Sequence, residues 1–243
     1  MNPSSDFSGE LSGTQTSAAP TAAQKNASNA FRGKPKKARY QSKRMFENDF
    51  LERFSHVHPA IPGLVFVPII LGLLVWGASF ESLTLVRCSM LGAAALLTWT
   101  FTEYFLHRFV FHADLPGKWG ARIHFMMHGV HHDDPQDPSR LVMPPAVSIP
   151  LAYLFYLGFR AVLGPVDSLP FTAFFLIGYL AYDYTHYYIH HAMPRTRWGK
   201  LVKASHMGHH YVSPDSRWGV STPLWDVVFG TLHSVKREQP QTR

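Results

Sequence analysis

Histidine is the residue type that could carry chemistry in this chain. Twelve of its fifteen histidines lie between His107 and His210, mostly adjacent or three to five residues apart. They fall into four short stretches, HRFVFH, HFMMHGVHH, HYYIHH and HMGHH. Neutral imidazole binds iron, zinc, copper and nickel, so this density indicates a metal site whose ion the ligand type does not fix. The single cysteine, Cys88, excludes a disulfide framework and a thiolate metal site.

The spacing of the histidines predicts two metals. Positions three and four apart share a helix face, so the triplet in HFMMHGVHH and the triplet in HMGHH can each aim imidazoles into one space. Adjacent histidines differ by about 100° around a helix, so each HH pair can reach two different metals. In HYYIHH, His186 and His190 lie one helical turn apart and offer two more ligands. The two histidines of HRFVFH suit the end of a helix, where the chain turns. The ten candidate ligands are His107, His112, His128, His131, His132, His186, His190, His206, His209 and His210. Helical spacing also admits His124 and His191.

Five nitrogen ligands per metal would leave one position of an octahedral ion open for oxygen, which is typical of a reactive site. Two carboxylates are candidates to support it. Glu103 lies one turn before His107, and Asp183 precedes His186 by three residues. A carboxylate that accepts the remote imidazole N–H fixes the tautomer of the ligand. The isolated His56, by contrast, is expected to be an ordinary polar residue.

Other catalytic motifs are missing from the sequence. It contains no HExxH, no paired ExxH, no GxSxG and no P-loop. This excludes the usual zinc proteases, soluble di-iron carboxylate proteins and nucleotide hydrolases. A divalent-metal transporter would need ligands along a path through the bilayer midplane, whereas these cluster at one face. A membrane hydrolase that uses zinc hydroxide stays chemically possible.

Long apolar runs predict the elements that position these histidines. A helix of about 20 apolar residues is about 30 Å long, which matches the hydrocarbon core of a bilayer. We expect an all-α integral membrane protein with four transmembrane helices in two hairpins, with the histidines of the dinuclear site just past the spans or in the cytosolic loops. The expected spans are about 61–80, 83–105, 141–163 and 169–188. A soluble helical protein would rarely contain two such pairs of apolar runs.

The basic residues predict the orientation. Lys and Arg are frequent in the N-terminal flank, the central segment and the C-terminal tail, and the two hairpin turns contain none. A multi-pass protein with both termini cytoplasmic follows, in the endoplasmic reticulum or a bacterial inner membrane. Arg87 and Arg160 lie near the opposite end and oppose the rule, unless they reach toward the interface. The net charge of +7 fits anionic lipid, and the hydrophobic fraction of 46% does not suggest nucleic acid as a partner.

The chain divides into two unequal parts. Residues 1–45 are polar and then basic, and we expect a disordered tail there because such a segment cannot bury enough apolar surface to offset its ordering entropy. Residues 46–243 form the expected membrane domain.

Several motifs together resemble one family. EYFLHRFVFH, HFMMHGVHH with SRLVMPP, YDYTHYYIHH, KASHMGHH and WGVSTPLWDVVFGTL are similar, in this order, to those of the fatty acid hydroxylase and sterol desaturase superfamily. The similarity runs from about Glu103 to Leu232 and is greatest to the fatty acid 2-hydroxylase branch. It implies two transmembrane hairpins beneath a cytosolic cap.

The resemblance also implies a site and a reaction. The family's ligands fall on the ten histidines named above, with His124 and His191 beside the metals but not bound to them. Two iron ions would be the cofactors, with zinc as another metal the site could hold, and O2 the co-substrate. The expected reaction is hydroxylation at the 2-position of an acyl chain, free or within a sphingolipid. A sterol desaturase or a carotenoid hydroxylase would use the same histidine boxes.

Eukaryotic members of this branch often carry a cytochrome b5 domain with an HPGG motif, where this chain has only His58-Pro59-Ala60. We therefore expect a separate electron donor, either a cytochrome b5-like protein or a ferredoxin with its reductase.

Overall fold

The computed structural model describes residues 42–232, and within that range it contains helices and no strands. Most of the predicted tail, residues 1–41, lies outside the described part. The α-helices are α2 (Asp49–Ser55), α3 (Ile61–Ala78), α4 (Leu85–Phe105), α5 (Gly117–His124), α6 (Val130–Asp133), α7 (Pro145–His191), α8 (Arg197–Tyr211) and α9 (Leu224–Val228). Two π-helical segments, η1 (Leu106–Phe111) and η2 (Phe125–Gly129), continue α4 and α5.

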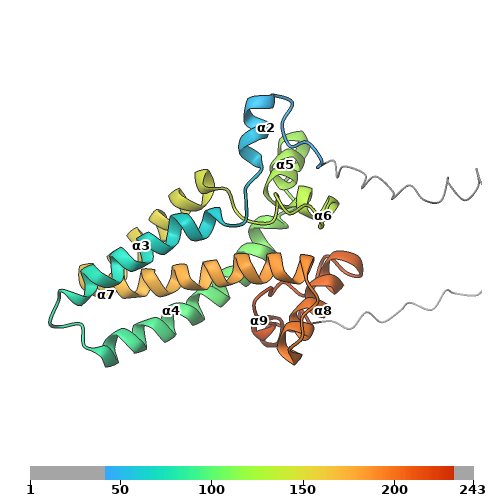
Figure 1. Ribbon diagram of the computed structural model, residues 1–243. Coiled ribbons are helices and arrows are strands. Elements are labelled where there is room, and N and C mark those ends of the chain that lie inside the picture. The colour runs from blue at the N-terminus through green and yellow to red at the C-terminus, as the bar shows by residue number, and fades with distance from the viewer. Residues whose placement is uncertain (1–41, 233–243) are drawn as a thin grey trace, which may run out of the picture. The chain divides into compact units, whose positions relative to one another are not determined.

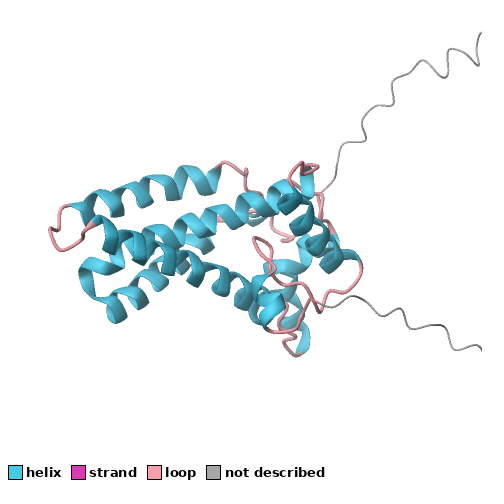
Figure 2. Ribbon diagram, turned by 90° about the horizontal axis from the view of Figure 1, so that it is seen from below, coloured by secondary structure: helices cyan, strands magenta, loops and turns pink. Residues whose placement is uncertain are grey.

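Long apolar helices form one layer and short helices form the other. α3, α4 and α7 run side by side, and α7 packs against both of the others. The short helices α2, α5, α6, α8 and α9 gather where α4 and α7 end, as two perpendicular views show (Figures 1 and 2). The histidine-rich segments therefore meet at one end of the long helices.

Three of the described helices are long and apolar enough to cross a membrane: α3, the segment Leu85–Phe111, and α7. The four spans predicted from the sequence are thus represented by three continuous helices. The reason is that α7, with 47 residues, begins at Pro145 inside the third predicted span and includes the rest of that span, the connection and the fourth span.

Gly164 breaks α7 into two halves that fold back on each other. Its φ of 81° and ψ of 176° are not helical and are almost restricted to glycine. Pro165 then starts the second half with a preset φ, which is favourable at a helix start. Phe155 and Phe175 are twenty residues apart, yet their ring centroids are 4.8 Å apart, and those of Phe159 and Phe171 are 4.7 Å apart. A straight helix would separate twenty residues by about 30 Å.

The core between the long helices is aromatic. Trp99 of α4 lies edge-on to Phe175 and Tyr179 of α7, with centroid distances of 5.1 and 5.6 Å. Gly178 allows this approach, since a Cβ atom there would lie 2.5 Å from the Trp99 ring. This packing brings the end of α4, with its histidines, against the histidine-bearing end of α7.

Candidate metal centre

Four segments deliver the ten candidate histidines to one region. η1 and the residue after it carry two, η2 with α6 carries three, the end of α7 carries two and α8 carries three. They form two groups whose ligand nitrogens lie within 4.8 Å of one another. The first histidine group is His107, His112, His128, His132 and His209. The second histidine group is His131, His186, His190, His206 and His210.

The π-helical segments explain how histidines five residues apart share one group. In an α-helix, residues five apart point about 140° apart. The backbone N–H of His112 instead bonds to the carbonyl of His107 at 3.2 Å, the i→i+5 pattern of the wider π turn. The wider turn brings both imidazoles into the first group.

The adjacent histidines divide between the groups. His132 and His209 belong to the first group, and their neighbours His131 and His210 belong to the second. Each triplet is thus split between the two groups. The rings of His132 and His210 stack with centroids 4.3 Å apart, which joins the groups. The pair at the end of α7 does not divide in this way, because only its first member, His190, lies in a group.

The spacing of the Nε2 atoms fits metal coordination better than mutual hydrogen bonding. Nε2 of His206 lies 2.9 to 3.0 Å from Nε2 of His186, His190 and His210. A neutral imidazole nitrogen has either one hydrogen or one lone pair, so it cannot bond to three others at once. Two nitrogens bound at a right angle to one ion, each at about 2.1 Å, would be about 3.0 Å apart.

The first group has the same geometry. Nε2 atoms of His112, His132 and His209 form a triangle with all three sides 3.1 Å long. Nε2 of His107 and His128 are also 3.1 Å apart. The donor set and spacing in both groups therefore fit a six-coordinate ion with five imidazoles.

Burial keeps these imidazoles neutral. It lowers the pKa of His112 to about 3 and that of His132 to about 4, helped by the neighbouring histidines, which repel a further positive charge. The pKa values of His128, His131 and His206 are lowered well below the ordinary value for the same reasons. Neutral imidazoles have free lone pairs, which is the state that binds a cation.

One loop, residues 216–221, orients two histidines of the first group. Nδ1 of His107 lies 2.5 Å from the carbonyl oxygen of Trp218, and Nδ1 of His209 lies 2.8 Å from that of Ser216. A carbonyl accepts only, so Nδ1 carries the hydrogen and Nε2 is left to face the group centre.

Glu103 acts on this loop and not on an imidazole, which corrects the sequence-based expectation. One of its carboxylate oxygens accepts from the backbone N–H of Val220 at 2.6 Å and of Ser221 at 2.7 Å, and the other accepts from the Ser221 hydroxyl. The remote nitrogen of His107 has a carbonyl partner instead. Glu103 therefore supports the first group indirectly, through this loop, and not by a hydrogen bond to one of its imidazoles.

Asp183 does not bond to His186 either. One carboxylate oxygen of Asp183 and Nδ1 of His186 are both buried without a hydrogen-bond partner among the described residues. The carboxylate lines the cavity described below. The expected support of His186 by Asp183 is therefore wrong.

His124 and His191 lie outside both groups. The ring of His124 is half-buried, 6.0 Å from that of His112, and His191 is exposed beside the ring of Tyr187 at 4.6 Å. Sequence reasoning missed Asp226, which accepts from the N–H of Trp218 at 2.9 Å and of Gly219 at 2.8 Å. Its place in the WGVSTPLWD motif was the available signal.

A cavity of about 460 Å³, which we call the histidine cavity, reaches both histidine groups. His128 from the first group and His131 and His186 from the second line it. Most of its other walls are apolar, including Phe111, Met126, Val130, Val142 and Met143, and residues of the segment 45–55 complete it. The arrangement can hold an apolar molecule beside both groups.

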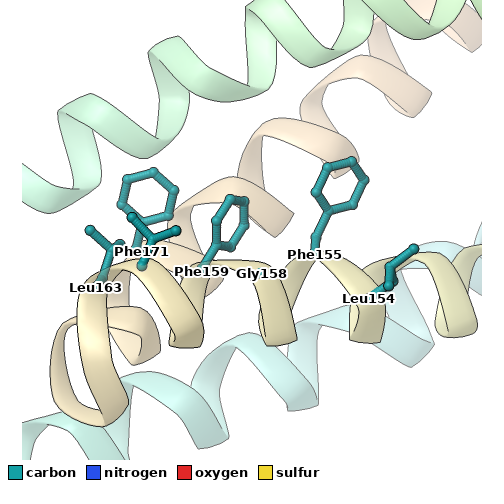
Figure 3. A pocket seen from close by; sticks show the side chains of 7 residues that line it. Leu154, Phe155, Gly158, Phe159, Leu163 and Phe171 are labelled. Carbon is teal, nitrogen blue, oxygen red and sulfur yellow. The ribbon is translucent and has the colours of Figure 1, made fainter.

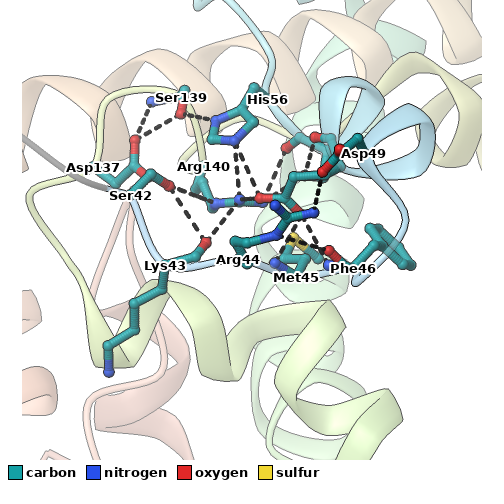
Figure 4. A network of polar contacts seen from close by, with 12 residues as sticks. Ser42, Lys43, Arg44, Met45, Phe46, Asp49, His56, Asp137, Ser139 and Arg140 are labelled. Carbon is teal, nitrogen blue, oxygen red and sulfur yellow. Dashed lines mark hydrogen bonds and ion pairs between the residues drawn. The ribbon is translucent and has the colours of Figure 1, made fainter.

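Arg140 lines this cavity and bonds to the segment 42–56 in a network of polar contacts (Figure 4). Its guanidinium donates to a carboxylate oxygen of Glu52 at 2.5 Å, to the Ser55 hydroxyl at 2.7 Å and to the Lys43 carbonyl at 2.8 Å. His56 also joins the network, with Nδ1 2.7 Å from the Ser139 hydroxyl. Residues 42–45, expected to belong to the tail, thus make contacts with the rest of the domain.

Fold and site together define a helical membrane protein with two candidate metal sites built from histidine. A model of the family described as "Fatty acid hydroxylase" matches residues 92–231. The chain belongs to the fatty acid hydroxylase family.

Named relatives agree with this assignment. The dihydroceramide fatty acyl 2-hydroxylase FAH2 of Arabidopsis thaliana is 38% identical over 194 residues, covering 79% of this chain and 81% of the relative. The fatty acid 2-hydroxylase of Rattus norvegicus is 36% identical over 211 residues, and the match covers 78% of this chain and 56% of that relative. The solved structure of full-length scs7p, in which only the hydroxylase domain is visible, is 31% identical with a TM-score of 0.72. That match covers 82% of this chain and 74% of scs7p.

Proposed function

We propose that this protein is an O2-dependent membrane lipid hydroxylase that places a hydroxyl group at the 2-position of an acyl chain, free or within a sphingolipid. The observation that carries the proposal is the histidine cavity, where an apolar wall faces two groups of five neutral imidazoles. The relatives named above are fatty acid and dihydroceramide 2-hydroxylases, which favours an acyl chain over a sterol or a carotenoid.

The two histidine groups would hold the cofactors, each with five imidazoles. Two iron ions bound there would supply the activation of O2 that cleavage of an acyl C–H bond requires, and zinc would fit the same ligands. The protein's own part is to orient the imidazoles through the loop 216–221 and to keep bulk water from the site. The reducing electrons would come from a separate protein, cytochrome b5-like or a ferredoxin with its reductase.

The cavity walls would position the substrate. Side chains such as Phe111, Val142 and Met143 would bury the methylenes of the acyl chain, at about 0.8 kcal/mol for each CH2 group. Asp183 and Tyr182 line the same cavity and offer polar atoms to the acyl head. The 2-carbon is next to the acyl carbonyl, so binding the carbonyl end at this wall would hold that carbon near the histidine groups.

We further propose four membrane crossings in two hairpins, with both termini and the helical cap on the cytoplasmic side. α3 and α4 would be the first hairpin, and the two halves of α7, before and after Gly164, the second. Arg87 lies at the end of the long helices away from the histidines, where the rule that Lys and Arg stay cytoplasmic does not expect a basic residue. Its guanidinium donates to Asp167 at 2.7 Å, so a counter-charge joins the turn regions of the two hairpins.

The test is lipid mass spectrometry after expression in a lipid-rich host, with and without oxygen. We expect a 2-hydroxyl group on acyl chains that is absent without O2 and absent in His128→Ala. The His191→Ala variant, which replaces an exposed histidine outside both groups, should form the product as wild type does. Turnover of lipid under anaerobic conditions without reductant would instead indicate a metal-dependent hydrolase.

A further inference from the structure

The outer surface of α9 and of the turn that follows it is apolar and exposed. Five side chains there are between 43% and 63% exposed: Leu224, Val227, Val228, Phe229 and Leu232. We call these five the C-terminal patch. The one charged residue of the segment 224–232 is Asp226, which is buried and bonds inward to the loop 216–221. An exposed apolar surface of this kind indicates a contact with a membrane or another molecule.

The C-terminal patch is attached to the side of α4. The indole N–H of Trp225 donates to the Thr100 hydroxyl at 3.1 Å. The ring of Trp225 lies edge-on to Phe101 at a centroid distance of 5.0 Å, and the ring of Phe229 stacks on Tyr104 at 5.3 Å. The patch therefore continues the outer surface of a helix that is long and apolar enough to cross a membrane.

Two arginines mark the ends of the apolar surface of this helix. Arg87 and Arg108 are 21 residues apart, which is about 32 Å of helix. The hydrocarbon core of a bilayer is about 30 Å thick, so the two charges would lie at its two boundaries. Thr100 and Phe101 precede Arg108 by eight and seven residues, which places their contacts with α9 about 10–12 Å along the helix from that boundary. The contact lies on the hydrocarbon side.

The backbone of this segment suits an environment without water, where every N–H group must bond within the protein. Carbonyl oxygens of the same segment or of Pro223 accept, at 2.8 to 3.3 Å, from the N–H groups of Val227, Phe229, Gly230, Thr231 and Leu232. The N–H of Leu224 donates to the Thr222 hydroxyl at 3.2 Å. The turn after α9 can therefore enter hydrocarbon although it is not helical.

The first half of α7 shows what the outer surface of a long helix consists of in this protein. Val162 is 83% exposed, and the groove that it lines is bordered by apolar side chains and Gly158, with no charged residue among them (Figure 3). The outer face of α8, in contrast, exposes Arg197 and Lys200. In composition the C-terminal patch is similar to the long helix and different from α8.

We propose that the C-terminal patch lies among the lipid acyl chains of the leaflet on the side of the histidine groups. This inference rests on the proposed membrane crossing of α4 and not on the reaction. The half-buried Arg108 fits this placement. Its guanidinium donates to the Tyr104 hydroxyl at 2.6 Å and lies 4.9 Å from the centre of the Phe109 ring, so its charge would lie at the level of the lipid phosphates.

In this placement the bilayer supports the loop that orients the first histidine group. Asp226 of α9 accepts from the N–H groups of Trp218 and Gly219, and the Thr231 hydroxyl donates to the same carboxylate at 2.7 Å. The carbonyl of Trp218 in turn orients His107. A displacement of α9 from the membrane would therefore loosen the loop 216–221.

Fluorescence quenching by lipid measures the position of the patch. The full-length protein, in a Cys88→Ser background, is placed in phosphatidylcholine nanodiscs whose acyl chains carry bromine, which quenches a fluorophore on contact. A fluorophore on Val228→Cys should be quenched as strongly as one on Leu97→Cys, an exposed position in the middle of α4. A fluorophore on Arg197→Cys, an exposed charged position of α8, should be quenched little.

The three positions separate the inference from its premise. If the label at Leu97 is quenched and the label at Val228 is quenched no more than that at Arg197, the C-terminal patch faces water and the inference is wrong. If the label at Leu97 is not quenched either, the proposed crossing of α4 fails, and the inference fails with it. Product analysis of the hydroxylation is independent of both results.

A charge on the patch tests the support of the loop. In nanodiscs, Val228→Asp would place a carboxylate in hydrocarbon, which is unfavourable, so α9 should move toward water. We expect severalfold faster amide hydrogen exchange in residues 216–221. Val228→Ile should keep the wild-type exchange, and so should Leu201→Asp, which replaces an exposed apolar side chain next to Lys200 on α8. Wild-type exchange in Val228→Asp would overturn the inference, because an exposed side chain in water tolerates this change.

Discussion

The carbonyl oxygen of Trp218 lies 2.5 Å from Nδ1 of His107, so a backbone atom more than a hundred residues away orients this candidate ligand. The loop that carries this carbonyl also bonds to Nδ1 of His209 through Ser216. Glu103 holds the loop in turn, through the N–H groups of Val220 and Ser221. The order of the first histidine group therefore depends on a carboxylate that touches none of its imidazoles through a hydrogen bond.

Replacing Glu103 with alanine should loosen the first histidine group. The variant leaves the buried N–H groups of Val220 and Ser221 without an acceptor, at a cost of about 1–3 kcal/mol each. We expect a lower thermal unfolding midpoint and a lower metal content, measured by elemental analysis of the purified protein. Glu103→Gln keeps an oxygen for both N–H groups and should lose much less. A Glu103→Ala protein with full metal content and wild-type stability would contradict this role.

Two metals per chain are expected, one in each histidine group. His209→Ala should remove mainly the metal of the first group, and His206→Ala mainly that of the second, because each loses one of five ligands. Elemental analysis after dialysis measures the metal-to-protein ratio. His191→Ala, outside both groups, is the control and should keep both metals. Equal metal content in all three variants would show that these histidines do not hold metal.

Gly164 should be needed for the fold-back of α7. Alanine there would have to adopt φ 81° and ψ 176°, at a cost of about 1–3 kcal/mol. Gly158→Ala is the matched control, because that glycine is helical and alanine is favoured in a helix by about 0.5–1 kcal/mol. We expect opposite shifts of the thermal unfolding midpoint in detergent, down for Gly164→Ala and level or up for Gly158→Ala. Shifts of the same sign and size would mean that Gly164 has no special backbone role.

The sequence was sufficient where residue type and spacing carry the information. The first predicted span, about 61–80, is α3 at Ile61–Ala78, because an uncharged run of that length has few alternatives to a helix. The predicted grouping of ten histidines at one end of the helices also matches where they lie. Repeated spacing on helices is a local property, and the sequence displays it directly.

The sequence was insufficient where a partner is distant or belongs to the backbone. Carbonyl acceptors such as that of Trp218 have no side-chain signature, so Glu103 was paired with the nearest histidine in sequence when its partners lie 117 and 118 residues away. Asp183 was paired with His186 by the same proximity argument. The role of Arg140 was also hidden, since a single arginine in a loop does not reveal which segment covers it.

Arg140 should keep α2 attached beside the histidine cavity. Its side chain is 2% exposed and pairs with Glu52, and removing one partner of a buried pair costs about 3–5 kcal/mol. We expect Arg140→Ala to raise amide hydrogen exchange in residues 45–55. Lys43→Ala is the control, because the pair of Lys43 with Asp133 is half-exposed and contributes about 1 kcal/mol or less. Equal exchange in α2 of both variants would contradict the anchoring role.

The attachment of α2 should weaken in acid. Burial alone would raise the pKa of Glu52, but hydrogen bonds from the Phe46 N–H and from Arg140 outweigh burial, so the pKa lies below its ordinary value of 4.5. A lowered pKa means that the carboxylate stabilises the folded state fully above pH 4.5 and loses this effect as the pH falls through the lower, folded-state value. Asp137 follows the same rule, because hydrogen bonds from Ser42 and Ser139 outweigh its burial.

The mobility of α2 measures this loss. A fluorophore on Phe50→Cys, an exposed position in a Cys88→Ser background, should keep constant anisotropy above pH 4.5 and lose anisotropy below it. Glu52→Gln has no carboxylate to protonate, so its anisotropy should be lower at neutral pH and should change less as the solution is acidified. If the label became mobile at the same pH and to the same extent in Glu52→Gln, protonation of Glu52 would not be what releases α2.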